Sequence, residues 1–354
     1  MIQVPVNGRS SDPGQGLLPM VYGGEVAAVG AADRKVQAYC FRPCMTKISG
    51  GGAVPLLSPR KYNPAHWQLV RNLFASNPHR TFHASDFAYF AGPLGNSTGD
   101  SAKYDVGTSG PINLDVVGES WAYPDANATR RAAIVERHVE HTLGFLHFMT
   151  TDPAVPATLK QEFQEWGFCG DEFEEGEHFP RSSLYVREAR RMVGDTVFTE
   201  KDRVSSLQKD DTIGVGSYNC DVHMVETIEQ RVNGTLWTLN EGWLTHDFPH
   251  VPFEMPLSLM LPRAAEALNL LVPVAVSASH VAFGAIRLEV TWSILGAAAG
   301  AAASLAAGNH GSPAAGGADV HSINVHELQR ILSEHGQYLN ASALRATPPR
   351  QVCS

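Results

Sequence analysis

The stretch that decides the fold is NLLVPVAVSASHVAFGAIRLEVTWSILGAAAGAAASLA, residues 269–306. Its first eight residues, 269–276, form a continuous apolar run, which is typical of a strand buried on both faces of a sheet. A loop of small residues follows at 277–289, and the uncharged run 290–307 is rich in alanine and glycine. Strand, loop and small-residue helix together predict an α/β unit in which the helix packs on the sheet.

The helical part of this stretch carries two glycines four residues apart. Gly296 and Gly300 share one helix face, because residues four apart are neighbours on a helix. A face of glycine and alanine predicts close contact with a strand or loop backbone. The uncharged run is close to the length that crosses a bilayer, but it has few large apolar side chains, so we expect no membrane span.

Composition bounds the class of protein. A length of 354 residues suggests two domains or one large one. Apolar residues make up 44% of the chain, which excludes global disorder. The net charge is -9 and no basic run is longer than two residues, so a nucleic-acid-binding surface is not expected. The first residues lack the basic start and apolar core of a signal peptide, and the sequence leaves the compartment open.

The cysteines and histidines do not form a metal-binding pattern. The five cysteines include no CxxC pair, and we expect Cys40 and Cys44 to be small buried residues on one strand face. The acidic stretch 171–178 lacks the glycine and the ligand register of a calcium loop. His138 and His141 lie one helical turn apart with no third ligand in view, so they are expected at the surface, and no metal is predicted.

Outside the stretch 269–306, the spacing of apolar residues predicts short strands and amphipathic helices. Asn63 and Pro64 are typical of a helix start, as is Asn127, and Gly167 is expected to end a helix. Helices are predicted at 63–77, 127–149, 157–166 and 321–336, and strands at 36–46, 184–187, 213–218 and 236–239.

Polar side chains gather at two further places. In an extended segment, Asn219, Asp221 and His223 lie on one face. They either orient a substrate hydroxyl and relay a proton, or form a hydrogen-bonded core network. The three arginines of VREARRM, residues 186–192, are expected to be solvated or paired with carboxylates.

The loop after the apolar run holds the strongest catalytic candidate. His280 follows Ser277 and Ser279, and its imidazole either acts as a general acid–base or is satisfied by nearby backbone. Arg287 and Glu289 are two residues apart, so on an extended stretch they face the same side. They either form an ion pair or leave Arg287 to bind an anionic group.

The stretch 269–306 resembles the C-terminal, flavin-side segment of FAD-dependent oxidoreductases of the glutathione-reductase-like superfamily, in a branch labelled xanthan-lyase-like. The resemblance continues in the same order along most of the chain. It covers the segments 36–46, 121–156, 183–202, 213–226 and 320–339.

The resemblance implies an α/β fold of the FAD/NAD(P)-binding, glutathione-reductase-like type with an α+β substrate or cap region. Residues 36–250 would form the substrate or cap region, and 251–310 would return to the flavin domain with a strand and a helix. Residues 320–340 would be a C-terminal helix. The loop-rich segment 1–35 lacks the family's opening strand and GxGxxG turn. The fold is therefore expected to be incomplete at the N-terminus, and the chain to bind FAD weakly or not at all.

FAD is the cofactor that the resemblance implies. Its expected contacts in the flavin-side segment are Ser277, Ser279, Gly284, Arg287, Glu289 and Thr291. His280 and His223 are the expected catalytic residues, and Asn219 and Asp221 the expected substrate contacts.

Hydride transfer from a polar organic small molecule to flavin is the function predicted first. The alternative is a non-catalytic remnant or binding module that keeps the fold without the cofactor. A carbohydrate lyase ranks last, because no paired catalytic carboxylates stand out.

Overall fold

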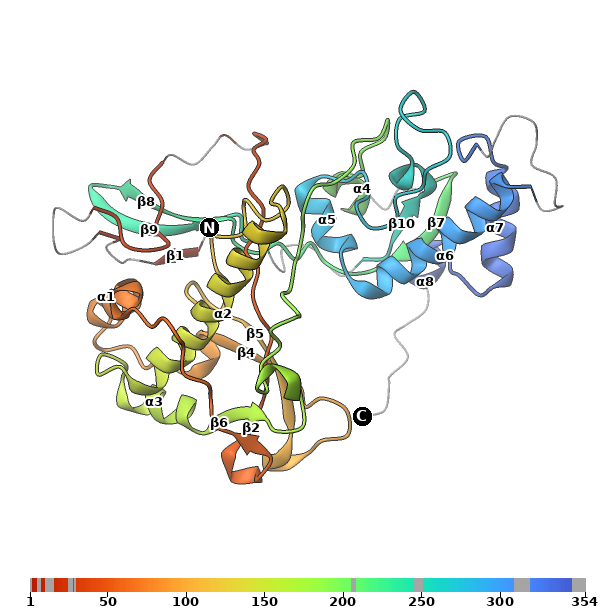
Figure 1. Cartoon of the computed structure of the whole chain (residues 1–354). Coiled ribbons are helices and arrows are strands. Elements are labelled where there is room, and N and C mark those ends of the chain that lie inside the picture. The colour runs from red at the N-terminus through yellow and green to blue at the C-terminus, as the bar shows by residue number, and fades with distance from the viewer. Residues whose placement is uncertain are drawn as a thin grey trace. The chain divides into compact units, whose positions relative to one another are not determined.

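The computed structural model describes residues 2–4, 8–9, 16–24, 28, 30–204, 208–244, 251–308 and 319–345 (Figure 1). The chain forms two compact units, and neither is one continuous segment. Unit 1 consists of Met1–Arg187 and His223–Trp243, and unit 2 of Glu188–Val222 and Leu244–Ser354. The chain therefore passes from one unit to the other three times. The roles predicted for the ranges 36–250 and 251–310 stay predictions.

Unit 1 contains two antiparallel sheets. The larger has the strand order β3 (Ala53–Val54), β6 (Trp166–Cys169), β2 (Cys44–Lys47), β5 (Lys103–Thr108) and β4 (Ala88–Ala91). The smaller pairs β1 (Ile2–Val4) with β9 (Thr235–Glu241) and β9 with β8 (Glu226–Val232). Asn233 and Gly234 join β8 to β9, and both have positive φ angles, 50° and 82°. This dipeptide is the preferred sequence of a two-residue hairpin turn.

The helices of unit 1 begin where the sequence predicts. Asn63 caps a 3-10 turn at Pro64–Trp67, which leads into α1 (Gln68–Ser76). Asn127 caps α2 (Ala128–Thr151) by accepting a hydrogen bond from the backbone of Arg130. These side chains satisfy backbone N–H groups that have no partner within the helix.

The third helix of unit 1 is shorter than predicted. α3 (Ala157–Gln164) ends before Trp166, which begins strand β6 instead. Gly167 lies inside that strand, and a Cβ there would meet the carbonyl oxygen of Val54. Gly167 is therefore required for close approach of β3 and β6, and its prediction as a helix end was wrong.

His138 and His141 lie in the core of unit 1 and not at its surface. His138 donates from Nδ1 to the carbonyl of Ile134 (2.8 Å) and lies 3.2 Å from the Ser120 hydroxyl. Burial lowers the pKa of His138 to about 4 and that of His141 to about 3, so both are neutral near pH 7. The surface prediction was wrong because the inward face of α2 includes these two positions.

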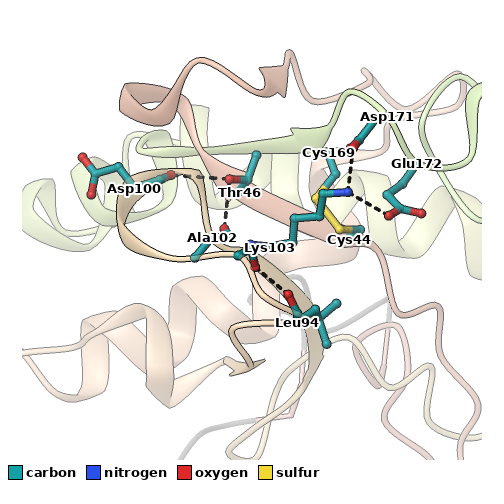
Figure 2. The surroundings of a disulfide bond; sticks show 10 residues. Cys44, Thr46, Leu94, Asp100, Ala102, Lys103, Cys169, Asp171 and Glu172 are labelled. Atoms are coloured by element: carbon teal, nitrogen blue, oxygen red, sulfur yellow. Dashed lines mark hydrogen bonds and ion pairs between the residues drawn. A yellow bond between two sulfur atoms is a disulfide. The ribbon is translucent and has the colours of Figure 1, made fainter.

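A disulfide joins Cys44 and Cys169 across neighbouring strands (Figure 2). Met45 pairs with Phe168, so the antiparallel register puts the two cysteines opposite each other, with Cα atoms 5.5 Å apart. Both Cys40 and Cys44 were predicted to be small buried residues. Cys40 is free and buried, but Cys44 is bonded to Cys169. The partners are 125 residues apart in sequence, and only the sheet register reveals the pair.

The described residues of unit 2 form one strand pair and several helices. β7 (Thr212–Gly216) pairs with β10 (Phe253–Pro256), and this confirms the strand predicted at 213–218. The helices are α4 (Glu200–Val204), α5 (His280–Ile286), α6 (Glu289–Ala306), α7 (Val325–Glu334) and α8 (Ala341–Arg345). The apolar core includes Phe198, Phe253, Leu259, Phe283, Leu295 and Leu328.

The buried strand predicted at 269–276 is not formed. This segment is irregular, and the side chains of Leu270 and Val274 are each 48% exposed. Pro273 has no N–H group to donate to a sheet. The strands predicted at 36–46 and 184–187 are also shorter than expected: the first is reduced to β2, and the second to a bridge between Tyr185 and Cys40.

The predicted packing face of α6 was also wrong. A Cβ on Gly296 or Gly300 would meet no atom within 4 Å, so both glycines face open space. The buried positions are instead Thr291, Leu295, Ala298 and Ala302. No single helix in the described ranges is long and apolar enough to cross a membrane. α5 and α6 reach the required length and composition only together, and they are bent by 89°.

The remaining turns are short. Residues 16–24 form turns and bridges, in agreement with the loop-rich segment predicted at 1–35, of which 1, 5–7, 10–15, 25–27 and 29 lie outside the described residues. Further 3-10 turns lie at Ile48–Gly50, Ala84–Asp86, Gly99–Ser101, Glu174–Gly176 and Leu257–Met260.

Candidate active site

His280 is the first residue of α5 and is held by the turn before it. The Ser279 side chain caps the helix by accepting a hydrogen bond from the backbone N–H of Ala282 (3.2 Å). The backbone N–H of Ser279 donates to the carbonyl of Phe198 (2.8 Å). The loop predicted at 277–289 thus contains a short helix, and its start fixes the backbone of His280.

The imidazole of His280 is oriented by a buried carboxylate. Its Nδ1 lies 2.9 Å and 3.0 Å from the two oxygens of Glu188, whose side chain is 0% exposed. A carboxylate only accepts hydrogen bonds, so Nδ1 carries the proton and Nε2 of the neutral ring has a free lone pair. The His280 side chain is 32% exposed. In the described part of unit 2, nothing is hydrogen-bonded to Nε2, so this atom is available as a proton acceptor.

Arg191 compensates the charge of Glu188. Its Nη1 lies 2.7 Å from a Glu188 oxygen, and its Nε donates to the carbonyl of Ala278 (2.9 Å). The guanidinium also lies over the Phe283 ring, 5.7 Å from the centroid. We call Glu188, His280 and Arg191 the Glu188 triad. All three members belong to unit 2.

A second set of the same chemistry lies in unit 1. His223 Nδ1 is 2.7 Å from one oxygen of Asp115, and Arg187 Nη1 is 2.9 Å from the other. Burial alone raises the pKa of Asp115, but the charge of Arg187 and the hydrogen bond with His223 outweigh it, and the pKa is lowered. We call Asp115, His223 and Arg187 the Asp115 triad.

The Asp115 triad is more enclosed than the Glu188 triad. The His223 side chain is 15% exposed, and the Asp115 side chain 0%. Arg187 also donates to the carbonyl of Ala38 (2.6 Å) and to Sγ of Cys40 (3.2 Å). Burial raises the pKa of the Cys40 thiol, so it stays protonated at neutral pH.

The predicted polar cluster of Asn219, Asp221 and His223 does not lie on one extended face, and its members belong to different units. Residues 217–221 are not in a strand, and Asn219 and Asp221 belong to unit 2 whereas His223 belongs to unit 1. Asn219 is buried. The Asp221 carboxylate pairs with Arg287 at 2.9 Å. The extended stretch expected to align Arg287 with Glu289 is absent, since Arg287 ends α5.

The predicted cofactor contacts mostly serve the fold of unit 2. Ser277 donates to the carbonyl of Thr196 (2.6 Å) and accepts from the backbone of Gly194 (3.0 Å). A Cβ on Gly284 would lie 2.8 Å from a methyl carbon of Val222, so this glycine is packed closely. Thr291 is buried.

A diphosphate needs several free donors. The Ser277 hydroxyl already donates to the carbonyl of Thr196, the Ser279 oxygen accepts from the backbone N–H of Ala282, and Glu289 is an exposed anion in the first turn of α6. The described residues 277–289 therefore fit proton transfer at His280 better than a diphosphate cradle, and the six predicted FAD contacts stay predictions.

A family model described as FAD dependent oxidoreductase matches residues 6–332. The chain belongs to this family. Its cofactor is therefore FAD, its activity class is oxidoreductase, and the mixed helices and sheets agree with the α/β fold that the family implies. No curated protein and no solved structure matches the chain.

Sequence reasoning named His280 and His223 as candidates, and their catalytic roles stay predictions, but it missed both carboxylates that contact them. Glu188 lies within the stretch 186–192, between the arginines, and is 92 residues from His280. Asp115 is 108 residues from His223. A glutamate three residues before an arginine was the one local signal, and it is a common pattern on protein surfaces.

Proposed function

We propose that this FAD-dependent oxidoreductase oxidises a small polar organic substrate and that His280 accepts the substrate proton. The observation that carries the proposal is the Glu188 triad. A buried carboxylate fixes Nδ1 of His280, and an arginine balances the charge of that carboxylate. Such an arrangement fixes both the tautomer and the orientation of a histidine base.

The proton step follows from the triad geometry. FAD, when bound, supplies the acceptor for the two electrons that leave with the substrate hydride. A substrate hydroxyl transfers its proton to Nε2 of His280, and its carbon–oxygen bond becomes a carbonyl as the hydride leaves. The imidazolium that forms donates from Nδ1 to Glu188, whose negative charge stabilises it. Arg191 remains paired with Glu188 throughout.

The finer assignments belong to the same proposal. We place the chain in the glutathione-reductase-like branch, with Asn219 and Asp221 as substrate contacts and His223 as a second acid–base residue. The order of the resembling segments supports this assignment. A second candidate, a binding module that does not hold FAD, is favoured by one observation, namely that the Ser277 and Ser279 hydroxyls are used within the fold.

The test separates cofactor content from chemistry. The purified chain is incubated with FAD, and bound flavin is measured from its visible absorption. Flavin reduction is then followed anaerobically with a panel of small alcohols, hydroxy acids and amines. His280→Gln should leave FAD content unchanged and slow flavin reduction by about 10²–10⁴-fold, the usual contribution of a general base.

The matched control is His79→Gln, because His79 is exposed and outside the triad. It should behave like the original chain. If the flavin of the His280→Gln variant is reduced by substrate at the original rate, His280 does not act as the base. A chain that takes up no FAD at any concentration would favour the binding module.

A further inference from the structure

Unit 1 contains an open cavity of about 430 Å³ between the turn before α1 and one face of α2. We propose that this cavity binds a small organic cation, namely an amine whose ammonium group is attached to an aromatic or alicyclic body. The residues that carry the argument are Tyr62, His66, Trp67, Glu136, Glu140 and His141. The inference does not depend on the proposed function of His280.

Of the three carboxylates that line the cavity, two have no ion pair among the described residues. Glu136 and Glu140 lie one turn apart on α2, so they share a helix face. Arg137 also lines the cavity, but it forms an ion pair with Glu119. Neither Glu136 nor Glu140 has an ion pair among the described residues. With Lys61 at the rim, the charged groups that line the cavity leave one net negative charge.

Glu140 presents an unsatisfied acceptor. Its Oε2 accepts a hydrogen bond from the backbone N–H of Lys61 (2.9 Å). Its Oε1 is buried and has no hydrogen-bond partner in the described part of the chain. A buried acceptor without a donor is costly, and a charged acceptor more so. Rotation of the Glu140 carboxylate would bring this oxygen to the cavity, where a ligand N–H group would supply the missing donor.

The histidine wall adds no positive charge. His141 Nε2 faces the carbonyl of Asn113 (3.3 Å), so it carries the proton, and Nδ1 is left to accept. His66 Nε2 lies 3.4 Å from that Nδ1 and is the donor of the pair. Burial lowers the pKa of His141 to about 3, and burial together with Arg137 lowers that of His66. Both rings are therefore neutral at physiological pH, and Nδ1 of His66 is an additional acceptor.

The aromatic residues decide the kind of cation. Tyr62 and Trp67 line the same cavity. Trp67 is 2% exposed and stacks on Phe148, so it is the half-buried Tyr62 ring that can attract an organic cation through its quadrupole. Among the described residues, no group of three or more histidine, cysteine or acidic side chains could hold a metal ion. The volume lies within the range of about 300–1,000 Å³ that is typical of small-molecule sites. Excess acceptors, net negative charge and apolar walls together fit an amine with an organic body.

The test uses the full chain and two probes of similar size. Phenethylamine is positively charged at neutral pH, and 2-phenylethanol is its neutral analogue. Binding is measured by isothermal titration calorimetry without added FAD. We expect the amine to bind with a Kd of about 1 mM or below and the alcohol to bind at least tenfold more weakly. Glu140→Gln should weaken amine binding about tenfold and should change alcohol binding little.

Glu175→Gln is the matched control, because Glu175 is exposed and outside the cavity. Circular dichroism establishes that each variant is folded, and Glu136→Gln replaces Glu140→Gln if the latter is not. Absence of amine binding, equal binding of the two probes, or amine binding that is unchanged in the cavity variant would each overturn the proposal. None of these results bears on His280, since no cofactor or oxidation is measured.

Discussion

The two triads share their chemistry and differ in their access to solvent. In each, an arginine and a histidine Nδ1 approach a carboxylate whose side chain is 0% exposed. His280 is about twice as exposed as His223, at 32% against 15%. The arginine of the Asp115 triad also bonds to a core carbonyl and to the Cys40 thiol. The Asp115 triad is therefore the more enclosed of the two and is expected to contribute more to stability, whereas the Glu188 triad leaves one histidine edge more open to solvent.

The largest expected effect tests the structural role of the Asp115 triad. Arg187→Met removes the main positive partner of a fully buried carboxylate, which typically costs about 3–5 kcal/mol. Arg191→Met should cost less, about 1–3 kcal/mol, because the Arg191 side chain is partly exposed and water reaches it. Urea unfolding of both variants measures the difference.

Tryptophan fluorescence is a suitable signal for this comparison. Five of the six tryptophans lie in unit 1, and the sixth, Trp292, lies in unit 2. The Trp292→Phe background reports unit 1 and is used for Arg187→Met. For Arg191→Met, which lies in unit 2, the signal of Trp292 is obtained as the difference between chains with and without the Trp292→Phe change. Equal losses of stability in the two arginine variants would mean that the triads do not differ in burial as described.

A smaller effect concerns the pH dependence of the unfolding free energy of unit 1. His138 and His141 have pKa values of about 4 and 3 in the folded chain, below the value of about 6.5 for an unfolded histidine. Between these values the unfolded chain binds more protons, so stability is full above pH 6.5 and falls as the pH is lowered toward 4. Each histidine contributes a slope of at most about 1.4 kcal/mol per pH unit.

His141→Gln should reduce this slope, because glutamine does not titrate. The slope is measured as the unfolding free energy at several pH values between 4 and 7. His79→Gln serves as the control, since His79 is exposed. An unchanged slope in His141→Gln would show that His141 is not buried as a neutral group.

The smallest effect compares two glycines of unit 2. Gly300→Ala adds a methyl group that meets no atom within 4 Å, so it should stabilise α6 by up to about 1 kcal/mol. Gly284→Ala adds one 2.8 Å from a Val222 methyl carbon and should destabilise the unit by about 1–3 kcal/mol. Denaturation midpoints followed by Trp292 fluorescence decide the signs. A loss of stability in Gly300→Ala would restore the predicted packing of that face.

The features predicted correctly are mostly local in sequence. Asn63 and Asn127 mark helix starts because their side chains bond to backbone groups two or three residues away. His280 was singled out because a short serine-rich turn precedes it, and the structure shows that Ser279 caps the helix it begins; its catalytic role stays a prediction. The strand predicted at 269–276 is absent from the structure. It was predicted from a run of apolar residues, and such a run does not show which side chains face a core.

The features that were missed depend on contacts between distant residues. Glu188, Asp115 and the Cys44–Cys169 disulfide each have a partner about 90 residues away or more. The burial of His138 and His141 depends on what packs against α2. Spacing along the chain carries no information on these contacts, so they required the structure.

The three passages of the chain between the units have a consequence for biosynthesis. When a ribosome has released residues 1–187, unit 1 still lacks β8 and β9, and Asp115 has received Arg187 but not His223. The missing hairpin emerges only after the first segment of unit 2, 188–222, which must itself wait for β10 and α5. Neither unit can finish folding from its first segment, so the nascent chain holds two partly formed cores from residue 188 until residue 243 is released. A chain that ends before residue 243 therefore contains neither unit complete.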